Sequence, residues 1–452
     1  MKRYEKYKPS GVEWLGEVPE HWEVKPLKFL TTKIVDGSHF TPTYIDTGVP
    51  FLRVTDIQNN DINMENIKYI PQEEHLELVK RCNPEKGDLL LSKNGTIGVT
   101  KVIDWNWEFS IFVSLCLIKF NTKINSTFAH YVFESHSLQE QIFGLTKKNT
   151  VTNLHLDKIR EFWFIVPTLN EQLGIINFLD KKTEKIDRLI SRQQALLEKL
   201  SEKRTALITE TVCGRVRLPT ALNDNETLSS NVPLRNSGIE WLGEVPKEWD
   251  IERTKFNFEF SKGLTITKEN LIDEGIPCVN YGEIHSKFGF EVNPEIHDLK
   301  YVSEDYLKYP SALLKKGDFI FADTSEDVKG SGNFTYLNSN IPTFAGYHTI
   351  IARLRKNHNP RFLAYVFASD AFRNQIRTQI KGVKVFSITQ AILKNTFIWL
   401  PKIDEQTAIV NYLDTETAKI DHLQNKIERV IERLKEYRSA LITQVVTGKV
   451  KV

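Results

Sequence analysis

The strongest constraint on this chain is a fifteen-residue phrase that occurs twice. Residues 10–24 read SGVEWLGEVPEHWEV, residues 237–251 read SGIEWLGEVPKEWDI, and ten of the fifteen positions are identical. We call these two stretches the signatures. A phrase repeated at an offset of 227 residues is the mark of an internal duplication.

The duplication extends over nearly the whole chain. Four further pairs of segments follow the signatures in the same order, and their offset grows from 227 to 234 residues. They are 48–57 with 275–284, 86–91 with 316–321, 162–187 with FIWLPKIDEQTAIVNYLDTETAKID ending at Asp421, and 205–218 with 439–452. A repeat of this length is too long for a solenoid unit. It predicts an object with internal pseudo-twofold symmetry.

Similarity between the copies is uneven. The signatures and the last part of each copy agree closely, whereas SKNGTIGVTKVID (92–104) barely aligns with ADTSEDVKGSGNFTYL (322–337). This pattern favours a common scaffold that carries two different recognition surfaces. Simple drift of surface loops is the alternative.

Length and composition narrow the class of protein. A chain of 452 residues with 40% hydrophobic and 26% charged residues predicts several globular domains. Apolar runs such as FWFIVP (162–167) are far shorter than a membrane span, and MKRYEKYKPS lacks the apolar core of a secretory signal. The net charge of +2 means that any binding of a polyanion depends on local basic surfaces.

The four cysteines lie far apart without a CxxC pair, so we expect neither structural zinc nor disulfides. We also expect a cytoplasmic location. They are Cys82, Cys116, Cys213 and Cys278.

Each copy combines two sequence patterns, one typical of a globular domain and one typical of a long helix. Residues 25–167 and 252–401 mix short β-branched or aromatic runs with turn residues and one clear helix each, at 128–143 and 361–376. This predicts mixed α/β (α+β) globular domains of undetermined strand order. The expected boundaries are a first globular domain 1–168, a helix 169–218, a linker 219–236, a second globular domain 237–401 and a helix 402–452.

The end of each copy has the spacing of a coiled-coil helix. Apolar residues from Ile420 onward alternate at three and four positions, and no proline or glycine interrupts 175–212 or 405–447. Gly214 and Gly448 supply the expected stops. The predicted seam consists of Leu179, Ile186, Leu189, Leu196, Leu200, Leu207, Leu413, Ile420, Leu423, Ile427, Val430, Leu434 and Leu441, with Tyr437 continuing it and polar residues at Gln193 and Lys203.

Two such helices in one chain are expected to bury their apolar seams against each other. The polar, turn-rich segment 218–238 can carry the chain away from the end of the first helix, which favours antiparallel packing. Forty helical residues at about 1.5 Å each give a rod of roughly 60 Å. The expected architecture is therefore two similar globular domains separated by a long antiparallel two-helix coiled coil.

Motifs of catalysis are missing from the sequence. There is no GxxxxGK[ST] phosphate loop, no Asp/Asn-Pro-Pro-Tyr/Phe methyltransferase tetrad, no glycine-rich cofactor fingerprint and no GxSxG elbow. The histidines form neither an HExxH nor an HxH ligand pair, so no metal site is predicted. A Ser/His/Asp site assembled from scattered residues stays open. The sequence therefore favours a protein that positions other molecules over an enzyme.

The ordered set of motifs closely resembles the DNA-specificity subunit of type I restriction–modification systems. The resemblance rests on the WLGEVPxxW signatures, DGSHFTP (36–42), KGDLLLS…GTIG (86–98), VPTLNEQLGIINFLD (166–180) and PKIDEQTAIVNYLD (401–414). It runs from about residue 10 to the C-terminus. The second copy departs from it, with SKGLTITKEN (261–270) in place of DGSHFTP and ADTSEDVKGSG in place of SKNGTIG.

The resemblance implies that each globular domain is a target recognition domain reading one half of a bipartite, asymmetric sequence in double-stranded DNA. The paired helices would set the gap between the half-sites, and a rod of roughly 60 Å is ample for half-sites about 34 Å apart. The implied partners are two modification (methyltransferase) subunits and, through them, restriction subunits, with no membrane. S-adenosylmethionine, ATP and magnesium would be bound by those partners and no cofactor by this chain.

Candidate DNA-contacting residues lie in loops rich in hydrogen-bonding and basic side chains. A purely structural turn or solvated loop is the alternative for each. In the first copy they are Asp36, Ser38, His39, Thr41, Tyr44, Lys93, Asn94, Thr96, Lys147, Lys148, Asn149, Thr150 and Asn153. In the second copy they are Lys262, Thr265, Lys329, Ser331, Asn333, Lys381 and Lys384, with Tyr281 and His348 as further candidates.

The signature tryptophans are interpreted as packing residues, because identical residues in both copies cannot distinguish two different half-sites. They are Trp14, Trp22, Trp241 and Trp249. Two other functions compete with DNA recognition: a coiled-coil scaffold that organises protein partners without binding DNA, and a stand-alone nuclease or methyltransferase.

Overall fold

The computed structural model describes residues 2–57, 62, 64–146, 153–216, 233–382 and 384–452. The chain divides into two compact units. Unit 1 contains residues 1–194 and 428–452, and unit 2 contains residues 195–427. Each unit therefore holds one globular domain and a segment of each of two long helices. Most of the predicted linker, 219–232, lies outside the described residues.

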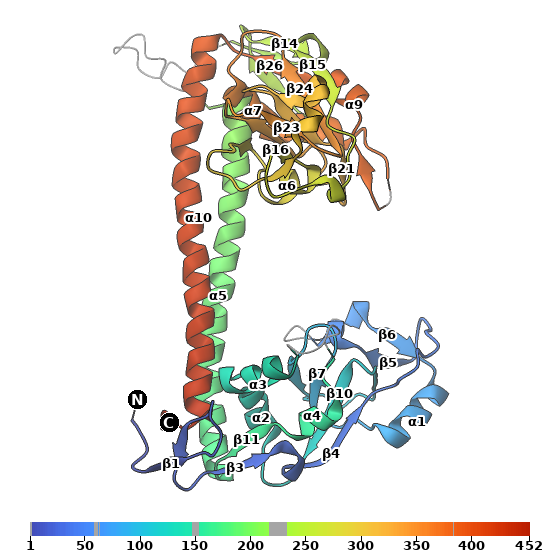
Figure 1. Ribbon diagram of the computed structural model, residues 1–452, viewed down its shortest axis with the longest axis vertical. Coiled ribbons are helices and arrows are strands. Elements are labelled where there is room, and N and C mark those ends of the chain that lie inside the picture. The colour runs from blue at the N-terminus through green and yellow to red at the C-terminus, as the bar shows by residue number, and fades with distance from the viewer. Residues whose placement is uncertain (1, 58–61, 63, 147–152, 217–232, 383) are drawn as a thin grey trace. The chain divides into compact units, whose positions relative to one another are not determined.

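The globular domain of unit 1 is built on a four-stranded antiparallel sheet of order β4-β10-β7-β8. Figure 1 labels β4, β7 and β10 of this sheet. These strands span Thr31–Asp36, Leu115–Phe120, Leu89–Ser92 and Thr100–Val102. A second sheet has the order β6-β5-β9, with strands Lys68–Ile70, Val49–Leu52 and Ser110–Ile111. The described helices of this domain include α1 (Gln72–Arg81), α2 (Ser126–Glu134), α3 (His136–Thr146) and α4 (Leu156–Arg160).

Both faces of the main sheet in unit 1 are buried. Leu89 and Leu91 of β7 enter the core that contains α2 and the start of the first long helix, whereas Leu90 between them enters a second core on the other face. A strand covered on both faces needs apolar residues at consecutive positions. This explains why the sequence KGDLLL is uninterrupted.

The globular domain of unit 2 repeats this plan. Its main sheet has the order β15-β24-β20-β22-β17, with strands Phe258–Lys262, Thr349–Leu354, Phe319–Ala322, Phe334–Leu337 and Glu291–Val292. The second sheet has the order β18-β16-β23-β19, with strands Lys300–Val302, Ile276–Val279, Thr343–Ala345 and Leu313–Leu314, and helices α7 (Pro360–Ala368) and α8 (Asp370–Arg377) follow. The predicted duplicated, mixed α/β fold is confirmed.

The chain enters and leaves each globular domain through two strands that pair with each other. In unit 1, β3 (Glu23–Pro26) pairs antiparallel with β11 (Trp163–Val166). In unit 2, β14 (Asp250–Arg253) pairs in the same way with β26 (Phe397–Leu400). The sequence between the paired strands is therefore a module whose two ends lie side by side.

The two long helices are α5 (Leu169–Val212) and α10 (Ile403–Val446). The hydroxyl of Thr168 donates to Glu171 in the first turn of α5 at 2.8 Å. Gly214 and Gly448 follow the helices with φ of 73° and 70°, the left-handed conformation that glycine adopts without strain. Both predicted stops are confirmed.

Each signature contacts the start of one long helix and the end of the other. In unit 1, Trp22 donates its indole N–H to Glu171 at 3.2 Å, and a Cβ at Gly448 would lie 2.8 Å from its ring. In unit 2, Trp249 donates to Glu405 at 3.1 Å, and a Cβ at Gly214 would lie 2.5 Å from Pro246. We call this arrangement the clasp.

The clasp and one ion pair fix the helix directions within each unit. Farther along the helices, Arg438 pairs with Asp187 in unit 1 and Arg204 pairs with Asp421 in unit 2, each at 3.0 Å. The start of one helix thus lies beside the end of the other in each unit, and the predicted antiparallel packing is confirmed there.

The packing prediction for the tryptophans holds for the clasp pair alone. Trp22 and Trp249 are 0% and 3% exposed, whereas Trp14 and Trp241 are each 39% exposed. The prediction is wrong for the latter two, because they precede the buried strand-and-turn part of the signature and lie at its surface.

The predicted helix seam is right at every seventh position and wrong between them. Leu179, Ile186, Leu413, Ile420, Ile427 and Leu441 are buried, and Leu200, Leu207 and Leu434 are half-buried. The prediction is wrong for the exposed side chains Leu189, Leu196, Leu423, Val430 and Tyr437.

The cause of this error lies in the globular domains. Thr183 follows Leu179 by four residues, is 5% exposed and bonds Tyr131; Thr417 is 4% exposed and bonds Tyr365 in the same way. Because these threonines are buried, the inward face of each helix includes the positions four residues after the buried seam residues. A regular helix keeps the same face inward along its length. The polar residues Arg204 and Arg438, which follow Leu200 and Leu434 by four positions, consequently lie in the seam. The apolar residues that follow seam residues by three positions face outward.

Candidate nucleic-acid interface

Three loops of the first globular domain meet at the carboxyl ends of β4 and β7. Lys93 after β7 reaches Asp36 at the end of β4, with Nζ and Oδ2 3.0 Å apart. Asn94 forms an isolated antiparallel bridge with Asn153. The structure therefore brings together candidate segments that are far apart in the sequence.

Asp36 is the centre of a buried charge cluster. Burial of its carboxyl opposes the charged form, but hydrogen bonds from Lys93, His39 and Arg81 prevail and lower its pKa to about 2. Arg81 also donates to the carbonyl oxygen of Gly37 at 3.2 Å. The cluster ties the loop after β4 to the loop after β7 and to helix α1.

Three of the predicted DNA contacts in this domain are buried in the structure. Asp36, Ser38 and Lys93 are 4–5% exposed, and each has an internal partner. The Ser38 hydroxyl donates to the carbonyl of Phe40 at 2.7 Å. In this structure they brace the loops, because their polar groups are covered and bonded to other parts of the fold.

The accessible candidates surround this brace. His39, Thr41, Tyr44 and Thr96 are exposed, and His39 approaches Asp36 at 3.1 Å. Phe40, which the sequence reasoning missed, is 58% exposed between two candidates. An exposed aromatic ring beside hydrogen-bonding groups can make apolar contact with a thymine methyl group.

Asn94 and Asn153 carry uncommitted acceptors. The Oδ1 atom of each side chain is buried, and among the described residues neither atom has a hydrogen-bond partner. An asparagine amide can pair with the N6 and N7 groups of adenine, so both residues stay candidates for base contact. Lys147, Lys148, Asn149 and Thr150 lie outside the described residues.

The loops of the second globular domain converge in the same way. Strand β21 (Thr324–Ser325) pairs with β25 (Phe386–Ser387), which joins the loop after β20 to the segment 379–387. Leu264 after β15 donates its amide N–H to Ala345 at 2.8 Å. All three candidate loops of this domain are thereby fixed around one end of its main sheet.

Two predicted contacts here have partners inside the fold. Ser331 is 0% exposed and donates its hydroxyl to the carbonyl of Asp327 at 3.2 Å. Asn333 donates its amide to Nδ1 of His285 at 2.8 Å and accepts a hydrogen bond from Arg373. Both amide groups of Asn333 therefore hold the loop together instead of being available to a base.

The remaining candidates form an exposed cationic surface. Lys262, Lys329, Lys381 and Lys384 are exposed, as is Thr265. In the part of the chain that the structure describes, no carboxylate lies within ion-pair distance of these four lysines. Unpaired exposed ammonium groups around one end of a sheet suit contacts with phosphates.

His348 is held at this end in a strained conformation. Its φ is 56°, which is uncommon for a residue other than glycine, and Nδ1 donates to Asp323 across 3.1 Å. The ring centroid lies 5.3 Å from that of Tyr281. Local strain of this kind is characteristic of functional loops.

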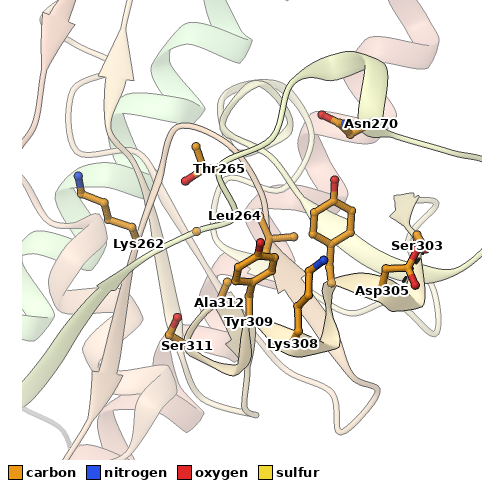
Figure 2. A pocket seen from close by; sticks show the side chains of 12 residues that line it. Lys262, Leu264, Thr265, Asn270, Ser303, Asp305, Lys308, Tyr309, Ser311 and Ala312 are labelled. Carbon is orange, nitrogen blue, oxygen red and sulfur yellow. Dashed lines mark hydrogen bonds between the residues drawn. The ribbon is translucent and has the colours of Figure 1, made fainter.

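Sequence reasoning missed two arginines and a groove in this domain. Burial, with the nearby charge of Arg377, lowers the pKa of Arg373 to about 10, so Arg373 still carries its charge at neutral pH. A groove of about 740 Å³ lies beside the end of β15 (Figure 2). The spacing of the arginines, i and i+4 on one helix, was the available signal for that pair.

Other kinds of site lack support in the described residues. No group of three or more His, Cys, Asp or Glu side chains there could hold a metal ion. Burial raises the pKa of Cys82 and Cys213 to about 12, so these thiols stay protonated at neutral pH. None of the described helices is both long and apolar enough to cross a membrane.

The doubled domain with paired loop clusters defines a class of protein. The family model of the type I restriction modification DNA specificity domain matches residues 19–199 and again 246–433. The chain belongs to this family, and each match spans one globular domain with most of the long helix that follows it.

Relatives agree along almost the full length. The type I restriction enzyme MjaVIII specificity subunit of Methanocaldococcus jannaschii is 21% identical over 96% of this chain and 94% of its own. The EcoKI specificity subunit of Escherichia coli is 20% identical over 96% and 90%. A solved chain from work on complex assembly and conformational transition of the type I R-M system has a TM-score of 0.66 and 15% identity over 96% of this chain and 99% of its own, which supports the fold.

Proposed function

We propose that this chain is the DNA-specificity subunit of a type I restriction–modification complex. Each globular domain reads one half of a bipartite, asymmetric sequence in double-stranded DNA. The observation that carries the proposal is the pairing of a common scaffold with two different loop clusters at equivalent sheet ends. Braced buried pairs such as Asp36–Lys93 hold these loops, and exposed residues such as His39 and Lys329 are available to DNA.

The chain itself is proposed to be non-catalytic. Methyl transfer, ATP hydrolysis and DNA cleavage belong to partner subunits, which bind S-adenosylmethionine, ATP and magnesium. The full complex, with two modification subunits and restriction subunits recruited through them, acts on DNA in the cytoplasm. The convergent loops are better suited to reading DNA than to the alternative role of a coiled-coil scaffold without a nucleic-acid ligand.

Exposed apolar side chains on the long helices support docking of two modification subunits. Unit 1 exposes Leu189, Val430 and Tyr437, and unit 2 exposes Leu196 and Leu423. Exposed apolar side chains become sites of association where they form a contiguous patch. Each unit offers such a set, which fits one modification subunit for each half of the chain.

Sequencing the methylome of cells that contain this chain and its cognate modification subunit tests the proposal. We expect a single bipartite motif with a fixed unread gap. Replacing residues 25–167 with the equivalent module of another specificity subunit should alter one half of the motif only, because strands β3 and β11 bring the module ends together. A change in both halves, or methylation without a bipartite motif, would contradict the proposal.

A further inference from the structure

The groove of the second globular domain lies against an edge strand of the main sheet. Its walls are the end of β15 with the residues that follow, and the segment 303–312 (Figure 2). Ser261 donates its hydroxyl to the carbonyl of Ser311 at 3.0 Å, which joins the two walls. The amide N–H of Gly263 donates to Thr349, next to the strained His348, at 3.1 Å. The groove is therefore continuous with the loop cluster of this domain.

The lining of the groove is cationic and rich in hydrogen-bonding groups. Lys262 and Lys308 belong to opposite walls, and within the described chain neither has a carboxylate at ion-pair distance. Thr265 and Tyr309 add hydroxyl groups. The lining acid is Asp305, whose carboxylate accepts the hydroxyl of Ser303 at 3.0 Å. A pocket for a small apolar ligand would instead be lined mainly by hydrophobic side chains.

The first globular domain has a different charge at the matched position. Gly37 and Gly263 are structural counterparts, because a Cβ at either would meet a backbone carbonyl oxygen at 2.0 or 2.1 Å. The residue before this glycine is Asp36 in the first copy and Lys262 in the second. The charge is therefore inverted between the copies.

The opposite wall differs as well. Between β6 and β7 the first copy has helix α1, whose Glu74 accepts the amide N–H of Thr43 at 3.0 Å and whose Arg81 binds the buried Asp36. These contacts fasten α1 to the loop after β4. The second copy has two short 3-10 helices there, Glu304–Lys308 and Pro310–Ala312, and Lys308 and Tyr309 face an open groove. The wall built from these two 3-10 helices therefore differs from helix α1 of the first copy.

We propose that this groove binds the sugar–phosphate backbone of the DNA duplex beside the second half-site. Lys262 and Lys308 each contact a phosphate, while Thr265 and Tyr309 donate hydrogen bonds to backbone oxygens. This inference rests on the proposed function and extends it with a backbone-positioning site. Phosphate contacts position a protein on DNA without reading its sequence.

The test is the salt dependence of DNA binding by the full chain assembled with its modification subunits. A short fluorescein-labelled duplex of random sequence serves as the probe, and anisotropy gives the affinity over a series of salt concentrations. Each phosphate contact contributes about 0.9 to the slope of log affinity against log salt. We expect Lys262→Ala and Lys308→Ala each to flatten the slope by about 0.9, and the double variant by about 1.8.

The matched control is Lys316→Ala, an exposed lysine of the same domain outside the groove. It should leave the slope unchanged, and thermal unfolding of each complex verifies that the variants are folded. The groove assignment would be overturned if the wild-type complex binds the duplex but Lys262→Ala and Lys308→Ala leave the slope of log affinity against log salt unchanged. A changed second half-site in the methylated motif would also overturn it, because the groove would then read bases.

Failure of the proposed function gives a different result. In that case the wild-type complex itself shows no salt-dependent binding to the duplex and no bipartite methylation motif. The two failures are therefore distinguishable in the same set of measurements.

Discussion

Trp22 and Glu171 are 149 residues apart in the chain, yet the indole Nε1 of Trp22 donates a hydrogen bond to Oε1 of Glu171 across 3.2 Å. The same relationship recurs between Trp249 and Glu405 at 3.1 Å. The duplicated signature therefore has a structural purpose. It anchors the beginning of one long helix beside the glycine stop of the other in each unit.

Replacing a clasp tryptophan should destabilise its unit. Trp22→Phe removes a partly buried hydrogen bond and part of a fully buried ring, which should lower the free energy of unfolding by about 2 kcal/mol. Urea unfolding followed by circular dichroism measures the change. Trp14→Phe, in the same signature but 39% exposed, is the matched control and should change it by less than about 0.5 kcal/mol. Equal effects of the two substitutions would contradict the clasp.

The register of the long helices gives a second test. Ile420→Asn places an amide at a position that is 5% exposed and should cost about 3 kcal/mol, whereas Leu423→Asn, at 47% exposure, should change the free energy of unfolding by less than about 0.5 kcal/mol. The comparison uses urea unfolding of the full chain. A larger effect at Leu423 would restore the seam predicted from the apolar pattern alone.

The scaffold was predictable from the sequence because its signals are local or repeated. The duplicated signature, the uninterrupted helical stretches and the glycine stops at Gly214 and Gly448 can each be read directly. The seam was only half readable, because inward-facing residues such as Thr183 and Arg438 are polar. Their partners, Tyr131 and Asp187, come from other elements that no local pattern identifies.

The candidate site was predictable as a set of loops but less so as a set of contacts. Lys93 and Asn333 belong to residue types that read DNA, yet Asp36 and His285 occupy their functional groups inside the fold. Those partners lie 57 and 48 residues away in the sequence. Burial and pairing depend on tertiary structure, so sequence alone cannot separate a brace from an exposed contact.

The Asp36 cluster predicts a pH dependence of stability. The folded-state pKa of Asp36 is about 2, below its ordinary value of 3.8, so its contribution is present above about pH 4 and is lost as the pH falls toward 2. That difference corresponds to about 2 kcal/mol. Urea unfolding of the wild type between about pH 5 and about pH 3 should show part of this loss.

Asp36→Asn should remove that pH dependence and leave Lys93 buried without a counter-charge. We expect the free energy of unfolding to fall by about 3 kcal/mol at neutral pH, with a smaller difference from the wild type in acid. Asp46→Asn, an exposed carboxylate in the loop that follows, is the control and should have little effect at either pH. A constant difference between wild type and Asp36→Asn at all pH values would refute the assignment.

The two histidines at the sheet ends should affect different halves of the DNA target. His39 in the first globular domain and His348 in the second are both exposed, and each approaches an aspartate at 3.1 Å. Under the proposed function, His39→Ala should relax or weaken one half of the methylated motif and His348→Ala the other, with the gap unchanged. Loss of a base contact costs about 1–3 kcal/mol, which corresponds to roughly 5-fold to 150-fold in affinity for the matched half-site. Methylome sequencing of cells carrying each variant gives the motif.

Because the two loop clusters belong to separate globular domains, the double variant should combine the two changes without a further effect. If either single substitution altered both halves, the domains would not act as independent readers.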